Sequence, residues 1–243
     1  MKHKRIAYTL VLIAVLLLGG CGKKQDNTDI NKLIASGENK KVIEMINNGY
    51  DINANVDSPL KSIATQNEVN NCSPLYMACQ SKNYDMIKFL LDNGADPNYS
   101  GYGLEYPFEV FMSKSYTDID AFKLFLEKGA DIEKHNIKTP LCALLSHYSK
   151  VDTAKQEIIE QEVLYLIDNG VNWRNDNLKE QYGGYSILHF VAATDRVEFM
   201  KTLLEYDEAK EYVNSTTNTG ETPYGIAKEN NQNGMCNMLK QER

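Results

Sequence analysis

Cysteine and histidine are the residue types in this chain with the widest chemical repertoire, and their spacing argues against catalysis. The 243 residues include five cysteines and four histidines: Cys21, Cys72, Cys79, Cys142, Cys236, His3, His135, His147 and His189. No Cys-X-X-Cys pair and no pair of histidines at helical ligand spacing occurs, so the metal-binding motifs are missing. The sequence also contains no glycine-rich phosphate loop and no nucleophile elbow. We therefore expect no enzyme, no metal or cofactor and no small-molecule substrate.

Cys21 stands apart from the other cysteines because it follows a segment typical of an export signal. A basic start is followed by an apolar run, residues 6–18, which only Tyr8 and Thr9 interrupt. Such a run is too short to be a comfortable permanent membrane span. The ending Leu18-Gly19-Gly20-Cys21 resembles the lipobox of bacterial lipoproteins, in which the cysteine sulfur receives diacylglycerol and cleavage follows just before it.

That resemblance implies three regions: residues 1–20 as a lipoprotein signal peptide, 21–27 as a lipidated tether and 28–243 as the folded domain. The mature protein would be exported and lipid-anchored to the bacterial cell membrane or outer membrane, facing the periplasm or the exterior. A plain signal peptide or an N-terminal anchor is the alternative interpretation.

The charge balance argues against a nucleic-acid partner. The chain carries 26 basic and 33 acidic residues, with an isoelectric point near 5.2. Removal of residues 1–20 would take away three basic and no acidic residues, which lowers the net charge from −7 to −10. Binding to phosphate backbones needs clustered Lys and Arg. Attachment to a membrane would accordingly depend on lipid and not on charge.

The rest of the chain repeats one kind of segment, a helix that ends in glycine before an acidic or asparagine-containing tail. The repeats begin at Ile43, Ile87, Phe122, Val163 and, in a degenerate form, Met200. A second marker of the Ser/Thr-Pro-Leu type precedes the helices, and its prolines Pro74, Pro107 and Pro140 are 33 residues apart. A fixed period of this length indicates a solenoid of stacked units.

Each repeat contains the signals of a helix pair. Ser73 before Pro74 is a helix N-cap followed by proline at the first helical position. Gly94 lies where a left-handed C-cap is needed, and Asp96 opens a turn into the next unit. Asp51 and Asp131 recur at the position of Asp96, so these acids are interpreted as turn formers and not as paired catalytic carboxylates.

Residues 73–79 together with 87–98 resemble the consensus of the ankyrin repeat family, and the likeness extends over about residues 28–240. The resemblance implies an all-α ankyrin-repeat solenoid of about six helix-turn-helix units with hairpin-like loops. It also implies that His189 braces the turn before its helix instead of acting as a general base. In the other units Tyr76, Glu109, Cys142 and Gly225 occupy that position, which departs from the consensus.

Such solenoids bind proteins through loop tips and first helices, so we expect a non-catalytic protein-binding scaffold of the cell envelope. The alternatives are an immunity or adaptor protein for a toxin or effector, and a thiol-redox protein or cryptic enzyme that uses Cys72 and Cys79. The four cysteines after Cys21 are interpreted mainly as buried thiols.

Aromatic residues in irregular segments are the candidates for the partner surface, because exposed Tyr and Trp are enriched at binding hot spots. The predicted protein-binding residues are Tyr99, Tyr102, Trp173, Arg174 and Tyr182. The alternative is that these rings pack onto adjacent repeats and stabilise long loops, which is the interpretation that we favour for Tyr106 and Tyr185.

Overall fold

The computed structural model describes residues 29–55, 72–99, 105–114, 118–134, 139–176 and 181–242. Within these ranges the chain forms six consecutive helix pairs, a 3₁₀ turn and one short additional helix. The pairs are α2 (Ile30–Ala35) with α3 (Asn39–Asn47), α4 (Pro74–Gln80) with α5 (Tyr84–Asp92), α6 (Pro107–Lys114) with α7 (Ile119–Glu127), α8 (Pro140–Leu145) with α9 (Thr153–Asp168), α10 (Ile187–Ala192) with α11 (Val197–Leu204), and α13 (Pro223–Glu229) with α14 (Asn233–Leu239). The 3₁₀ turn η1 (Tyr148–Lys150) follows α8, and α12 (Asp207–Lys210) follows α11.

The first helices begin where local capping chemistry dictates. Ser73, Thr139 and Thr222 each accept a hydrogen bond from a backbone N–H of the first turn, and proline follows each of them. Because proline has no N–H to leave unsatisfied at this position, the cap and the proline together fix the start of the helix. The sequence prediction of these three starts is confirmed.

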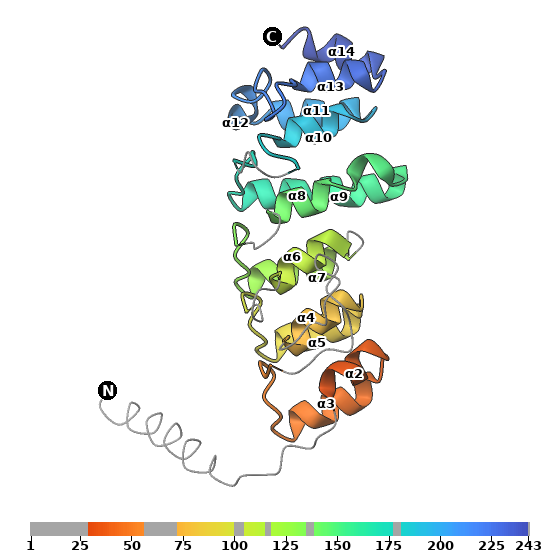
Figure 1. Cartoon of the computed structure of the whole chain (residues 1–243), viewed down its shortest axis with the longest axis vertical. Coiled ribbons are helices and arrows are strands. Elements are labelled where there is room, and N and C mark those ends of the chain that lie inside the picture. Colours follow the sequence, from red (N-terminus) through yellow and green to blue (C-terminus); the bar gives the residue numbers. More distant parts are fainter. Residues whose placement is uncertain are drawn as a thin grey trace, which may run out of the picture.

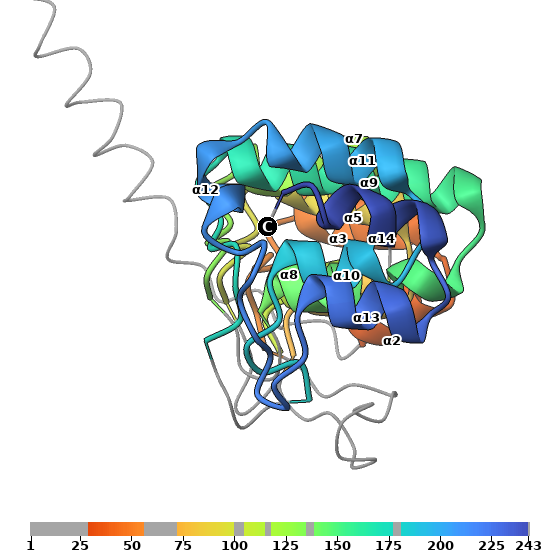
Figure 2. The same cartoon turned by 90° about the horizontal axis from the view of Figure 1, so that it is seen from above.

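The helix pairs stack along one axis, so that each unit contacts its neighbours in the chain (Figure 1). Seen along that axis, the first helices of the pairs form one layer and the second helices form the other, with the described loops between successive pairs gathered along one side (Figure 2). The surface made by the first helices and these loops is called the first-helix face below. This is the expected all-α ankyrin-repeat solenoid.

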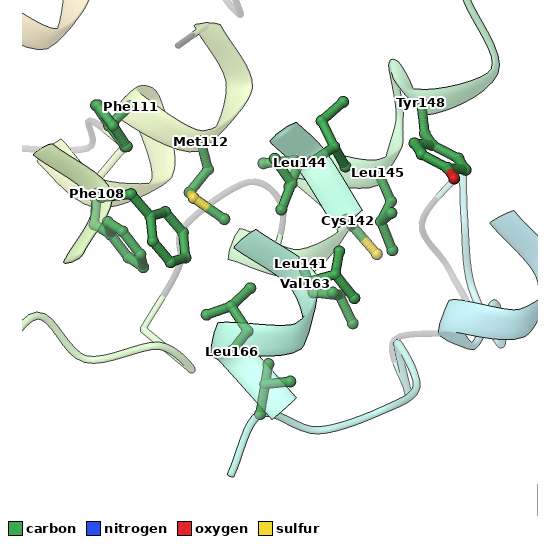
Figure 3. Packing of buried hydrophobic residues seen from close by; sticks show 14 of the residues in the cluster. Phe108, Phe111, Met112, Leu141, Cys142, Leu144, Leu145, Tyr148, Val163 and Leu166 are labelled. Atoms are coloured by element: carbon green, nitrogen blue, oxygen red, sulfur yellow. The ribbon is translucent and has the colours of Figure 1, made fainter. Parts of the chain in front are cut away.

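The core runs continuously between the two helix layers because apolar side chains of each unit pack against the next unit. Figure 3 shows buried side chains running from α6, with Met112, to α8, with Leu144 and Leu141, and on to Val163 of α9. The rings of Phe108 and Phe111 also pack against Phe125 of α7, with centroids 5.3 and 5.0 Å apart. No single pair could bury such a surface alone, which is why the units must stack.

Hydrogen bonds between successive loops set the register of the stack. The side-chain amide of Asn98 donates to the carbonyl of Gly129 and accepts from the N–H of Asp131, at 2.7 and 2.8 Å. Asn53 makes the equivalent pair of bonds to the next loop along the chain. Asp96 accepts from the N–H of Asn98 within its own turn, which confirms its interpretation as a turn former.

In the described residues no helix is long and apolar enough to cross a membrane. Residues 1–28, which include Cys21 and the predicted signal, lie outside those residues, as does Tyr102.

Candidate functional site

A cavity of about 250 Å³ lies on the first-helix face and is called the aromatic pocket below. Its lining comes from α8, η1, α10, α13 and the turn at residues 181–185. The aromatic members are Tyr182, Tyr185, His189 and Phe190, and the charged members are Lys150, Glu221 and Glu229. A concave, aromatic site with a few polar groups is the usual form of a binding site.

The pocket is lined by residues of the fourth, fifth and sixth units, and the fourth unit differs in length from the others. The η1 turn packs against α10, and α9 has 16 residues where the other second helices have seven to nine. A second hollow of about 360 Å³ lies between α9 and α11 on the opposite face. Across this junction Arg196 donates to both carboxylate oxygens of Glu160, at 2.7 and 2.8 Å. This partly buried ion pair joins the two units and lines the second hollow.

A folded-back loop positions the two tyrosines of the pocket. Residues Arg174 and Ser186 form an antiparallel bridge, and the N–H of Gly184 donates to the carbonyl of Asn175 at 2.7 Å. Gly184 has a φ of 76°, and a Cβ there would lie 3.0 Å from the backbone of Thr217. Only glycine therefore lets this turn fit against the following loop.

His189 supports the floor of the pocket from within the core. Its Nδ1 accepts from the N–H of Ser186 at 3.0 Å, and its Nε2 lies 3.2 Å from the carbonyl oxygens of both Ser215 and Glu221. Since the carbonyls can only accept, Nε2 carries the proton and the ring is neutral. Burial lowers the pKa of His189 to about 4. The predicted bracing role is confirmed, because all these contacts join turns around the helix start.

The structure corrects the prediction that Trp173 belongs to an exposed partner surface. Its side chain is only 6% exposed, and its ring packs against Tyr206 and Tyr212 with centroids 5.7 and 6.5 Å away. The turn before α12 and the one after it come back over the indole, which is the packing alternative that the sequence left open.

The other predicted binding residues have mixed positions. Tyr182 is half-buried and lines the aromatic pocket. Tyr99 is half-buried in a loop of the second unit, with its hydroxyl bonded to the side chain of Asn55. Arg174 donates to the carbonyl of Thr216 at 3.3 Å and so links two loops. The structure brings Tyr182 to the pocket and places Tyr99 in a different unit, outside the pocket lining.

Sequence reasoning missed most of the pocket. The sequence favours Tyr185 as a packing residue and contains no motif that singles out Phe190, Glu221 or Glu229, yet all four line the pocket. The tyrosines on either side of Gly183-Gly184 are a sequence signal for an aromatic site. Nothing near them in the sequence indicates which distant carboxylates line the same pocket.

The four described cysteines, Cys72, Cys79, Cys142 and Cys236, are buried free thiols. Within the described residues no group of histidines, cysteines and acids is arranged to hold a metal ion.

Comparisons with known proteins agree with this architecture. Residues 70–102 match the ankyrin repeat family model. A putative ankyrin repeat protein of Acanthamoeba polyphaga mimivirus is 28% identical in a 175-residue alignment that covers 65% of this chain and 22% of the viral protein. The crystal structure of the human ASB11 ankyrin repeat domain is similar with a TM-score of 0.59 and 21% identity, over 89% of this chain and 84% of that domain.

The fold thus defines a helical repeat protein with an aromatic pocket on its first-helix face. Residues 70–102 match an ankyrin repeat, and the helix pairs have the fold of an ankyrin-repeat solenoid. The chain spans about a fifth of the length of the viral relative that it matches.

Proposed function

We propose that this chain is a lipid-anchored, non-catalytic protein-binding scaffold of a bacterial cell envelope. The observation that carries the scaffold role is the aromatic pocket on the first-helix face, where half-buried Tyr182 and Tyr185 remain accessible to a partner. Aromatic side chains of this kind bury a large area at low cost in rotamer entropy.

The anchoring half of the proposal is supported by the sequence around Cys21. A basic start, a short apolar run and a small-small-Cys ending together favour export and lipidation of Cys21. The multiple acyl chains of a lipoprotein supply the two or more chains that stable anchoring needs. The folded domain would then face the periplasm or the exterior.

Site-specific photo-crosslinking in the organism that carries the gene tests the binding face. A photoreactive amino acid replaces Ser149, an exposed member of the pocket lining, in the full-length chain. The matched control carries it at Lys201, an exposed position on α11 in the opposite layer. We expect a discrete crosslinked protein from position 149 and none from position 201. Equal crosslinking at both positions, or none at either, contradicts the proposal.

Cell fractionation of Cys21→Ala tests the anchor. Without the sulfur no diacylglycerol can be attached, so the variant should leave the membrane fraction or accumulate as an uncleaved precursor. A variant that stays membrane-bound at the normal mature size would exclude lipidation at Cys21.

A further inference from the structure

The aromatic pocket contains a cluster of three aromatic rings. The ring centroids of Tyr182, Tyr185 and Phe190 lie between 5.1 and 5.4 Å from one another, so the three rings form one cluster in the lining. The faces of aromatic rings carry negative potential and attract ammonium and guanidinium groups.

Two carboxylates complete this arrangement. Glu221 and Glu229 line the same pocket as Tyr185, and the Glu221 carboxylate accepts a hydrogen bond from the Thr219 hydroxyl at 2.7 Å. Burial, reinforced by the negative charges of both glutamates, raises the pKa of the Tyr185 hydroxyl. In the described part of the chain no Lys or Arg forms an ion pair with either glutamate. Lys150 is the one basic residue of the lining, so the two acids outnumber it.

Other tyrosines of this molecule already have a cation from the chain itself. Lys134 lies over the ring of Tyr106 with Nζ 4.9 Å from its centroid, and Lys240 lies 5.8 Å from that of Tyr224. Lys123 covers Tyr165 in the same way. Among the described residues no such cation covers Tyr182 or Tyr185, which leaves both rings available to a cation from outside.

The size of the pocket and its polar groups favour arginine as the occupant. A cavity of about 250 Å³ is below the range of roughly 300–1,000 Å³ typical of small-molecule sites, so it suits one side chain better than a whole ligand. The planar guanidinium stacks on aromatic rings and also pairs with carboxylates, whereas a lysine ammonium is a strongly hydrated point charge.

We propose that the aromatic pocket receives an arginine side chain from a basic segment of the partner protein, held between the tyrosine rings and the carboxylates of Glu221 and Glu229. The inference rests on the proposed scaffold function, since it names the chemistry of the partner at that same face.

Saturation-transfer NMR tests the inference with the full-length chain in non-ionic detergent micelles. The probes are the blocked peptide Gly-Ser-Arg-Ser-Gly and three analogues with citrulline, lysine or glutamate at the centre. We expect saturable binding of the arginine peptide and weaker binding of the lysine peptide. Citrulline keeps the shape of arginine without its positive charge, and glutamate carries a negative charge. Neither the citrulline peptide nor the glutamate peptide should therefore show a saturable signal.

Charge-removing variants locate the binding. Glu229 is exposed, so Glu229→Gln should fold normally and weaken binding of the arginine peptide by about threefold or more. Tyr182→Leu should weaken it by a similar factor. The matched control, Glu198→Gln, changes an exposed glutamate on α11 in the opposite layer and should leave binding unchanged.

The inference is overturned if arginine and citrulline peptides bind equally, if the glutamate peptide binds best, or if Glu229→Gln and Glu198→Gln behave alike. The crosslink from position 149 distinguishes failure of the arginine inference from failure of the proposed scaffold role. A crosslink that persists at full yield in Glu229→Gln and Tyr182→Leu keeps the scaffold role and rejects the arginine. Absence of any crosslink rejects the scaffold role itself.

Discussion

Glu162 is the most unfavourably placed ionisable residue among those described. It lies on α9 with 1% of its surface exposed, and neither carboxylate oxygen has a hydrogen-bond partner in the described structure. Burial, reinforced by the negative charge of Asp118, raises its pKa to about 8. Because the unfolded chain ionises near the ordinary value of 4.5, the folded state holds an extra proton between these two values. Stability must therefore fall as the pH rises from about 4.5 to about 8.

Replacement of Glu162 by glutamine should remove this penalty. Relative to the unchanged protein, the free energy of unfolding of Glu162→Gln should rise with pH, from little difference near pH 4.5 to about 4 kcal/mol near pH 8. Urea denaturation across this range measures it. Glu157→Gln, at an exposed position of the same helix, is the control. A difference that does not depend on pH would contradict the assignment of a raised pKa.

His189 gives the opposite pH dependence. Its pKa is lowered from 6.5 to about 4, so the unfolded chain binds the proton first as the pH falls. The contribution of the neutral His189 ring to stability is complete above pH 6.5. The free energy of unfolding should decline by about 3 kcal/mol as the pH falls towards 4. NMR of the imidazole carbons should show His189 neutral at pH 5.5. A titration midpoint near 6.5 in the folded protein would show that the buried hydrogen bonds do not hold the ring neutral.

At the scale of the element, the loop between α9 and α10 depends on one close approach of two backbones. Gly184 and Gly220 both have positive φ, but a Cβ at Gly184 would contact the backbone of Thr217 and Asn218, whereas nothing lies within 4 Å of one at Gly220. Alanine substitutions at these two glycines therefore separate the free-energy cost of backbone strain from the cost of a steric clash of the added Cβ.

Gly220→Ala should destabilise the protein by about 1 kcal/mol through backbone strain alone. Gly184→Ala should cost clearly more, and it should also displace Tyr182 and Tyr185 and so weaken the arginine peptide, because the turn that carries them must move. Thermal denaturation and peptide binding measure the two effects. Equal loss of stability in both variants would mean that the loop can shift without cost.

The whole molecule is a linear stack, so its two ends should open more readily than its middle. All four described cysteines are buried, but Cys236 belongs to the last helix pair, whereas Cys79 and Cys142 lie in interior units. The thiols thus report on local opening at different places along the solenoid.

Native-state thiol labelling should modify Cys236 first and the interior thiols much more slowly, with four labels in all after denaturation without reductant, apart from Cys21. Mass spectrometry of the peptides gives the rate at each site. Identical rates for Cys236 and Cys79 would indicate one cooperative opening of the whole stack, and fewer than four labels would reveal a disulfide.

The repeat architecture could be predicted from the sequence because local chemistry determines it. Ser73 and Thr139 cap helices within one turn, and Gly94, with a φ of 94°, ends a helix where only glycine is unstrained. These signals act over a few residues and recur with the period of the units. They indicate the order of the helix pairs and their stacking without any knowledge of distant contacts.

Only the tertiary structure decided which aromatic rings are available. Trp173 is covered by Tyr206 and Tyr212, and Tyr185 meets Glu221, although each of these partners is more than 30 residues away in the chain. Loop insertions in two neighbouring units determine these contacts, and an insertion has no periodic pattern that predicts its path. Burial therefore removes Trp173 from the binding surface, and packing between units makes the pocket from residues that no local motif connects.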